Sequence, residues 1–177
     1  MNKSTIKKLS EIYKLGHLPC RGDQLYDKTF RLANCFEHAC LNLTDQEIEQ
    51  YCITENDSCE FGNFYSITQK GTSLEIERTL KKTGLQIEKC TPDKVINFNQ
   101  WKVALYFEYF YTLNRDFHFL IQEKDGSWSG KIGYTSKCHH FKNLPESVCC
   151  DKRYYNLYET FCITNPYATK EKEHSIE

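Results

Sequence analysis

The residue best suited to covalent chemistry is Cys35. It lies in the stretch Asn-Cys-Phe-Glu-His-Ala-Cys-Leu, where a polar loop gives way to apolar residues at helical spacing. Backbone N–H groups and the positive dipole end at the start of a helix favour the thiolate, which is the nucleophilic form of cysteine. We therefore expect Cys35 to be the most readily alkylated of the ten cysteines at neutral pH.

His118 is the second such residue, because it opens the run Phe-His-Phe-Leu-Ile-Gln, which has the composition of a β-strand. We expect it to be half exposed at a cleft, where an imidazole can take the proton of the Cys35 thiol as a general base. The competing interpretation is that Cys35 is a small buried hydrophobic residue and His118 an ordinary strand residue. We interpret His38, one helical turn from Cys35, as a packing or surface residue.

Four helices are expected in the first half of the chain. An amphipathic helix over residues 4–15 ends at Gly16, and a second helix begins near Cys35. Two capping boxes, one at residues 44–47 and one at residues 72–75, predict helices that run to about residue 52 and to residue 83. Gly84 is placed to end the last of these helices.

The second half of the chain has the pattern of a β-sheet. Strands are expected over residues 85–88, 101–111, 117–123, 128–134 and 154–164, with 101–111 in the centre of the sheet. Asp125-Gly126 predicts a two-residue hairpin turn, which would place Gly133 opposite His118. In the last strand we expect the following residues near the core: Tyr155, Leu157, Tyr158, Phe161 and Ile163. Helices followed by antiparallel strands predict one α+β domain over residues 1–167, with a polar tail over 168–177.

Composition excludes several classes of function. The net charge is −1 and basic residues form no stripe, so we expect no nucleic-acid partner. No apolar stretch approaches the length of a membrane span, and the N-terminus lacks the apolar run of a signal peptide. We therefore expect mostly free thiols in a reducing compartment: the cytoplasm, or a host cell that the protein enters without a standard export signal.

Three short blocks of the sequence resemble a group of mostly uncharacterised bacterial and phage-type proteins. These blocks are Asn-Cys-Phe-x-x-Ala at Cys35, then Asp-Phe-His-Phe-Leu-Ile-Gln-x-x-Asp-Gly-Ser-Trp-Ser from Asp116, and a later segment from Asp151 to Cys162. In that group the second block reads approximately Asp-Phe-His-Trp-Tyr-Arg, followed by Asp-Gly-x-Trp-Ser-His-Lys-Pro-Gly. By the order of its elements the group is similar to papain-like, NlpC-type and CHAP-type cysteine hydrolases.

The resemblance implies a papain-like α+β fold and a peptidase, amidase or glutamine deamidase that needs no cofactor and could act as a bacterial effector. Cys35 would be the nucleophile and His118 the base, acting on a protein or peptide substrate. Gln24 would help to stabilise the oxyanion, although it also fits an exposed loop residue. Asp151 would orient His118, since the residues around Gly133 include no carboxylate or amide. The sequence departs from the group at Gly130 and Ile132, where the group tends to have His and Pro.

Two other classes of protein compete with a hydrolase. A zinc-stabilised binding domain is suggested by Cys138-His139-His140 and Cys149-Cys150, although adjacent cysteines do not have the usual ligand spacing. A non-catalytic binding module or inhibitor with an aromatic groove would use the twelve Tyr and eleven Phe residues, which core packing explains equally well.

Overall fold

The fold was analysed in a computed structural model that describes residues 3–17, 35–43, 68–108, 116–132, 138–150 and 152–169. The side chain of Cys138 lies outside this description. The expected helix over residues 44–52 also lies outside it, as do the candidate site residues Gln24 and Asp151. None of the described helices is long and apolar enough to cross a membrane.

Three helical elements are described. Helix α1 (Lys3–Lys14) buries Leu9, Ile12 and Tyr13 on one face and is followed by Gly16 at a φ of 81°, in agreement with the sequence pattern. The segment that begins with Cys35 continues as a short π-helix, η1 (Glu37–Leu41), which ends at Asn42 in the left-handed conformation.

Helix α4 (Gln69–Lys82) begins one turn earlier than the sequence pattern predicts. Its N-cap is Thr68, whose hydroxyl accepts a hydrogen bond from the Gly71 N–H at 3.0 Å. The predicted cap, Thr72, instead lies buried within the helix. Gly84 follows the helix at a φ of 93°, so the predicted end is confirmed.

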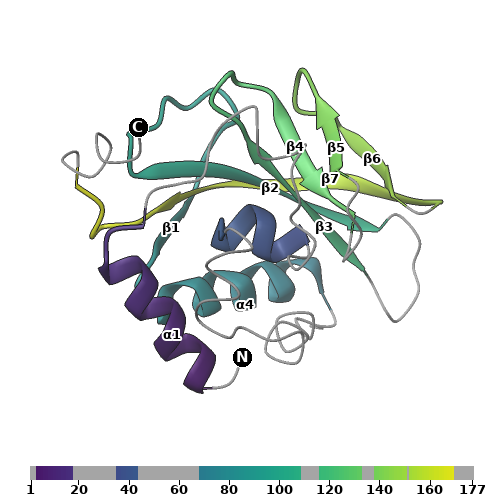
Figure 1. The fold of residues 1–177 in the computed structure, drawn as a ribbon. Helices are drawn as coiled ribbons and strands as arrows, with labels where there is room; N and C mark the ends of the chain where they lie inside the picture. The colour runs from purple at the N-terminus through teal and green to yellow at the C-terminus, as the bar shows by residue number, and fades with distance from the viewer. Residues whose placement is uncertain are drawn as a thin grey trace.

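In the part of the chain that the structure describes, seven antiparallel strands form one sheet, which confirms the α+β class (Figure 1). The order along the sheet is β1-β7-β2-β3-β4-β5, and β6 pairs with β7 outside this path. The strands are β1 (Gln86–Lys89), β2 (Gln100–Glu108), β3 (Phe117–Gln122), β4 (Trp128–Lys131), β5 (Cys138–Phe141), β6 (Ser147–Cys150) and β7 (Arg153–Thr164). Strand β2 is central, as predicted, whereas β5 and β6 were not expected from the sequence.

Both faces of the sheet carry an apolar core. Helices α1, η1 and α4 lie on one face, where they pack against alternate residues of β2 and β3 such as Val103, Phe119 and Ile121 (Figure 1). The opposite core contains Ala104, Tyr106, Leu120, Trp128 and Val148. Because side chains alternate along a strand, His118 lies with Leu120 on the face away from the helices.

A bulge in β7 separates its two halves. The pairing of β2 with β7 shifts between Leu105, which faces Glu159, and Tyr106, which faces Leu157. The skipped residue, Tyr158, is 38% exposed, so its predicted place in the core is wrong, while Tyr155, Phe161 and Ile163 are buried. Strict alternation cannot foresee a bulge, because the extra residue changes the phase of the pattern. Beyond the end of β7, Ala168 is buried, although the sequence pattern places it at the start of a polar tail.

The hairpin between β3 and β4 also differs from the prediction. The N–H of Glu123 donates to the carbonyl of Ser127, and the N–H of Gly126 donates to the carbonyl of Glu123, which closes a three-residue turn. Only Gly126 in this turn has a positive φ, at 86°, whereas a two-residue Asp-Gly turn requires two such residues. The longer turn moves the register by one residue, so that Ile121 faces Ser129 and, by extension, His118 faces Ile132 instead of Gly133.

Candidate active site

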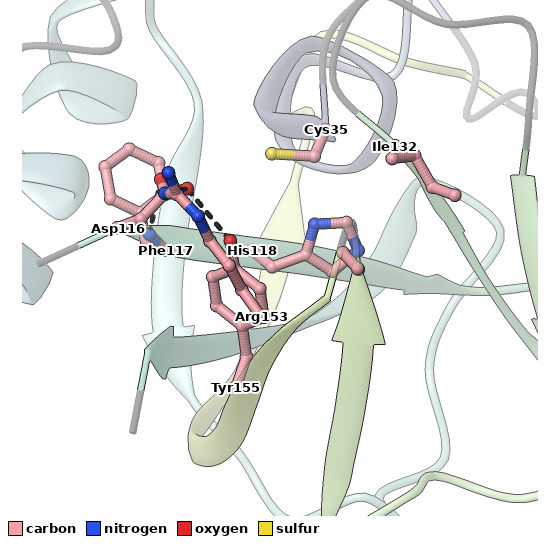
Figure 2. Close-up of a pocket in the computed structure, with 8 residues that line it drawn as sticks. Cys35, Asp116, Phe117, His118, Ile132, Arg153 and Tyr155 are labelled. Atoms are coloured by element: carbon pink, nitrogen blue, oxygen red, sulfur yellow. Dashed lines mark hydrogen bonds and ion pairs between the residues drawn. The ribbon is translucent and has the colours of Figure 1, made fainter. Parts of the chain in front are cut away.

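Cys35 and His118 line one pocket of about 380 Å³ at the start of β3. Figure 2 shows both side chains directed into this pocket, Cys35 from the helical segment and His118 from the strand. The remaining lining residues come from β3, from the end of β4, and from the β6–β7 hairpin: Asp116, Phe117, Ile132, Cys150, Arg153 and Tyr155. The structure thus brings together the two residues that the sequence singled out.

The helical segment that carries Cys35 is anchored on both sides. The ring of Phe36 packs edge-on against that of Phe119, with 5.6 Å between ring centroids. The indole N–H of Trp101 donates to the carbonyl of Ala39 at 3.1 Å. Within the described residues, β3 and β4 pair only at Ile121–Ser129 and Gln122–Trp128, which leaves the first half of β3 open to this segment.

The Cys35 thiol is protonated in the free protein. Burial of the sulfur raises its pKa from the ordinary 9.0 to about 12, and the nearby Asp116 carboxylate adds to the rise. Hydrogen bonds from the backbone N–H groups of Phe119 and Phe36 lower the pKa but do not outweigh burial. Cys35 is half-buried at the pocket, and the burial of its sulfur opposes the thiolate that we expected at a helix start.

His118 is neutral in the free protein. Burial lowers its pKa from 6.5 to about 3, and the imidazoles of His139 and His38 contribute to the decrease. The residue is 4% exposed, which corrects the expectation of a half-exposed side chain at a cleft. The hydrogen-bonding capacity of its Nε2 atom is unused among the described residues, and no acidic or amide side chain there orients the ring.

Asp116 organises the mouth of the pocket and was not predicted as a site residue. One of its carboxylate oxygens accepts hydrogen bonds from the Tyr155 hydroxyl at 2.9 Å and from Arg153 Nη1 at 3.3 Å. Its other oxygen accepts the Phe117 N–H at 2.9 Å. The signal in the sequence was its place two residues before His118, because residues i and i+2 share a side of a strand.

The described cysteine and histidine side chains of β5 and β6 do not form a metal cluster. Cys150 Sγ lies 3.8 Å from His139 Nε2, but His140 Nε2 instead contacts the Ser127 hydroxyl at 2.9 Å. Cys149 is exposed on the opposite side of β6 from Cys150. Among the described residues no three His, Cys, Asp or Glu side chains are grouped so that they could hold a metal ion, so the zinc interpretation gains no support there.

His38 is buried at the interface of η1 with β4, where its Nε2 atom lies 3.4 Å from the Ser129 hydroxyl. Burial lowers the pKa of this imidazole to about 4, with a further decrease caused by Lys131. This placement agrees with the interpretation of His38 as a packing residue.

Comparisons with known proteins give no match: no family model, no curated protein and no solved structure is similar to this chain.

Proposed function

We propose that this protein is a cysteine-dependent hydrolase of papain-like organisation, which acts on an amide of a peptide or protein. The observation that carries the proposal is the shared pocket of Cys35 and His118, which lie far apart in the sequence. The thiol comes from a helical segment that precedes the sheet, and the imidazole comes from the start of a sheet strand. Papain-like enzymes use this order of nucleophile and base.

The Cys35 thiol and the His118 imidazole are both neutral before the reaction, so the proton passes between them only when the sulfur attacks the substrate. In the proposed reaction, His118 takes the thiol proton as the Cys35 sulfur attacks the carbonyl carbon of the amide. The C–N bond breaks, the leaving amine receives that proton, and a thioester remains on Cys35. Water, deprotonated by His118, then hydrolyses the thioester and restores the thiol. The backbone N–H groups of Phe119 and Phe36 stabilise negative charge on the sulfur as it develops.

The size of the pocket supports a small reacting group. Its volume of about 380 Å³ is near the lower end of ligand pockets and has room for a single side chain or a short acyl segment. A glutamine side chain or one residue of an extended peptide meets this limit. The six cysteines whose state is described are free thiols, which supports action in a reducing compartment such as the cytoplasm, or a host cell that receives the protein as an effector.

A non-catalytic binding module is the second candidate. The observation that favours it is the combination of a raised pKa for Cys35 with a lowered pKa for His118, which opposes formation of a thiolate–imidazolium pair. Such a protein would use the same pocket to hold a side chain of a partner protein without reacting with it.

Treatment of a cell lysate with the wild-type protein or with the Cys35→Ala variant separates the two candidates. Peptide mapping by mass spectrometry should show new chain termini for a peptidase or amidase, or deamidated glutamine side chains for a deamidase, only with the wild type. Identical maps for the two proteins would favour the binding module.

A further inference from the structure

Among the described residues, none donates or accepts the hydrogen bond that orients the histidine ring in a catalytic triad. Its Nε2 atom is buried, and it has no hydrogen-bond partner among the described residues. On that side the backbone of β4 closes the site, since a Cβ atom on Gly130 would lie 3.1 Å from Nε2 and 2.2 Å from a Leu120 methyl. Position 130 therefore has no space for a side chain that could orient the ring.

Two aromatic side chains contact the His118 ring. The Tyr155 ring lies 5.8 Å from the His118 ring, centroid to centroid, with 45° between their planes. The His139 ring contacts His118 edge-on, with 6.4 Å between centroids. Tyr155 is 4% exposed, so a rotation of the His118 ring toward it requires Tyr155 to move within packed surroundings.

Tyr155 is in turn fixed at its far end. Its hydroxyl donates to Asp116 Oδ2 at 2.9 Å, and the same carboxylate is held by the Phe117 N–H and by Arg153 Nη1 (Figure 2). A hydrogen bond to an ionised carboxylate is stronger than one between neutral groups. Asp116 immediately precedes β3, which carries His118, so this hydrogen bond ties β7 to the same short stretch that carries the imidazole.

We infer that Tyr155, anchored by Asp116, is a positioning residue for His118. The inference rests on the proposed function for its catalytic meaning, but the contact that it describes is independent of any reaction. Loss of the Tyr155 hydroxyl frees the ring to shift, and the His118 imidazole then samples more than one orientation. A misplaced base slows the transfer of the Cys35 proton, and small displacements of this kind cost on the order of a hundredfold in rate.

The test is NMR of the histidine rings in protein labelled with ¹⁵N, for the wild type and for Tyr155→Phe. The matched control is Tyr158→Phe, a hydroxyl deletion at the bulge of the same strand, where the ring packs on Phe107 instead of His118. Asp116→Asn is the second variant, because this half-exposed side chain can be replaced with little risk to folding. It retains an acceptor for Tyr155 but removes the charge.

We expect Tyr155→Phe to shift the His118 ring signals and to broaden or average them, with a smaller change in Asp116→Asn and none in Tyr158→Phe. If the His118 signals of Tyr155→Phe match those of the wild type, the positioning role is wrong, whatever the activity of the protein. If the signals change as expected but no substrate acylates Cys35 of the wild type, the positioning role holds and the proposed hydrolase is wrong.

Discussion

Alkylation of Cys35 should be slow in the free protein and should accelerate steeply with pH. Burial raises the pKa of this thiol from 9.0 to about 12. Since each pKa unit changes the thiolate fraction tenfold, Cys35 at pH 7 holds about a thousandfold less thiolate than an ordinary cysteine. Cys149 is the internal comparison, because it is exposed and lies on the opposite side of β6 from Cys150, which lines the pocket.

The assay is a time course with limiting iodoacetamide at several pH values between 6 and 10, with each cysteine read by fragmentation mass spectrometry. We expect Cys149 to be modified well before Cys35 at pH 7, and the rate at Cys35 to rise about tenfold per pH unit without levelling off. A Cys35 rate that exceeds that of Cys149 at pH 7, or that reaches a plateau between pH 6 and 8, would refute the reasoning. Such a result would mean that a thiolate–imidazolium pair exists in the free protein.

Three further predictions concern stability. Because His118 is buried, His118→Ala should lower the free energy of unfolding by about 1–3 kcal/mol, and His118→Gln should lower it by less. Thermal melts measure both changes. Equal melting temperatures for the wild type and His118→Ala would show that the His118 side chain is not packed. Gly130→Ala should cost about 1–3 kcal/mol because its Cβ would lie 2.2 Å from a Leu120 methyl, and it should disturb the His118 ring. Gly126→Ala, which has open space but a φ of 86°, should cost about 1–2 kcal/mol and leave His118 unchanged; a reversed pattern would contradict the packing around Gly130. Burial lowers the pKa of His118 to about 3 and of His38 to about 4, both below the 6.5 of an unfolded chain, so the unfolded state binds more protons below pH 6.5. Stability should therefore be retained above pH 6.5 and should fall by about 1.4 kcal/mol per pH unit for each imidazole toward pH 4. Denaturant titrations at pH 7, 6 and 5 would measure this decrease. Equal stability at the three pH values would contradict the burial of both imidazoles.

The pairing of Cys35 with His118 in one pocket could be anticipated from the sequence because it depends on the order of elements. A helix start followed by a strand start places both residues at the same end of a helix-on-sheet domain. Helix α1 and strands β2, β3 and β7 also lie close to their predicted positions, since their apolar periodicity is strong.

The protonation states could not be anticipated, because they depend on what surrounds a side chain and not on its own element. The sequence places Cys35 at a helix start, which favours a thiolate, but only the folded chain shows that it is half-buried in a pocket that Asp116 also lines. The exposure of His118 was misjudged for the same reason, since Tyr155 and His139, which cover it, come from distant strands.

Short strands and turns were the other source of error. Strands β5 and β6 have four residues each and owe their conformation to pairing with β4 and β7, which no local pattern reveals. The three-residue turn at Gly126 changed the register by one residue and so replaced Gly133 with Ile132 beside His118. Asp116 was visible in the sequence, but its role needed its contact with Tyr155.

The proposed pair of Cys35 and His118 is tested most directly by covalent labelling with an electrophile that mimics a peptide amide. Rates should be compared for the wild type, His118→Gln and Cys35→Ala at pH 7, with thermal melts to show that each variant is folded. We predict that the wild type is labelled at Cys35, that Cys35→Ala is not labelled in the pocket, and that His118→Gln reacts more slowly by a factor on the order of 10²–10⁴. Equal labelling rates for the wild type and a folded His118→Gln protein would contradict the assignment of His118 as the base.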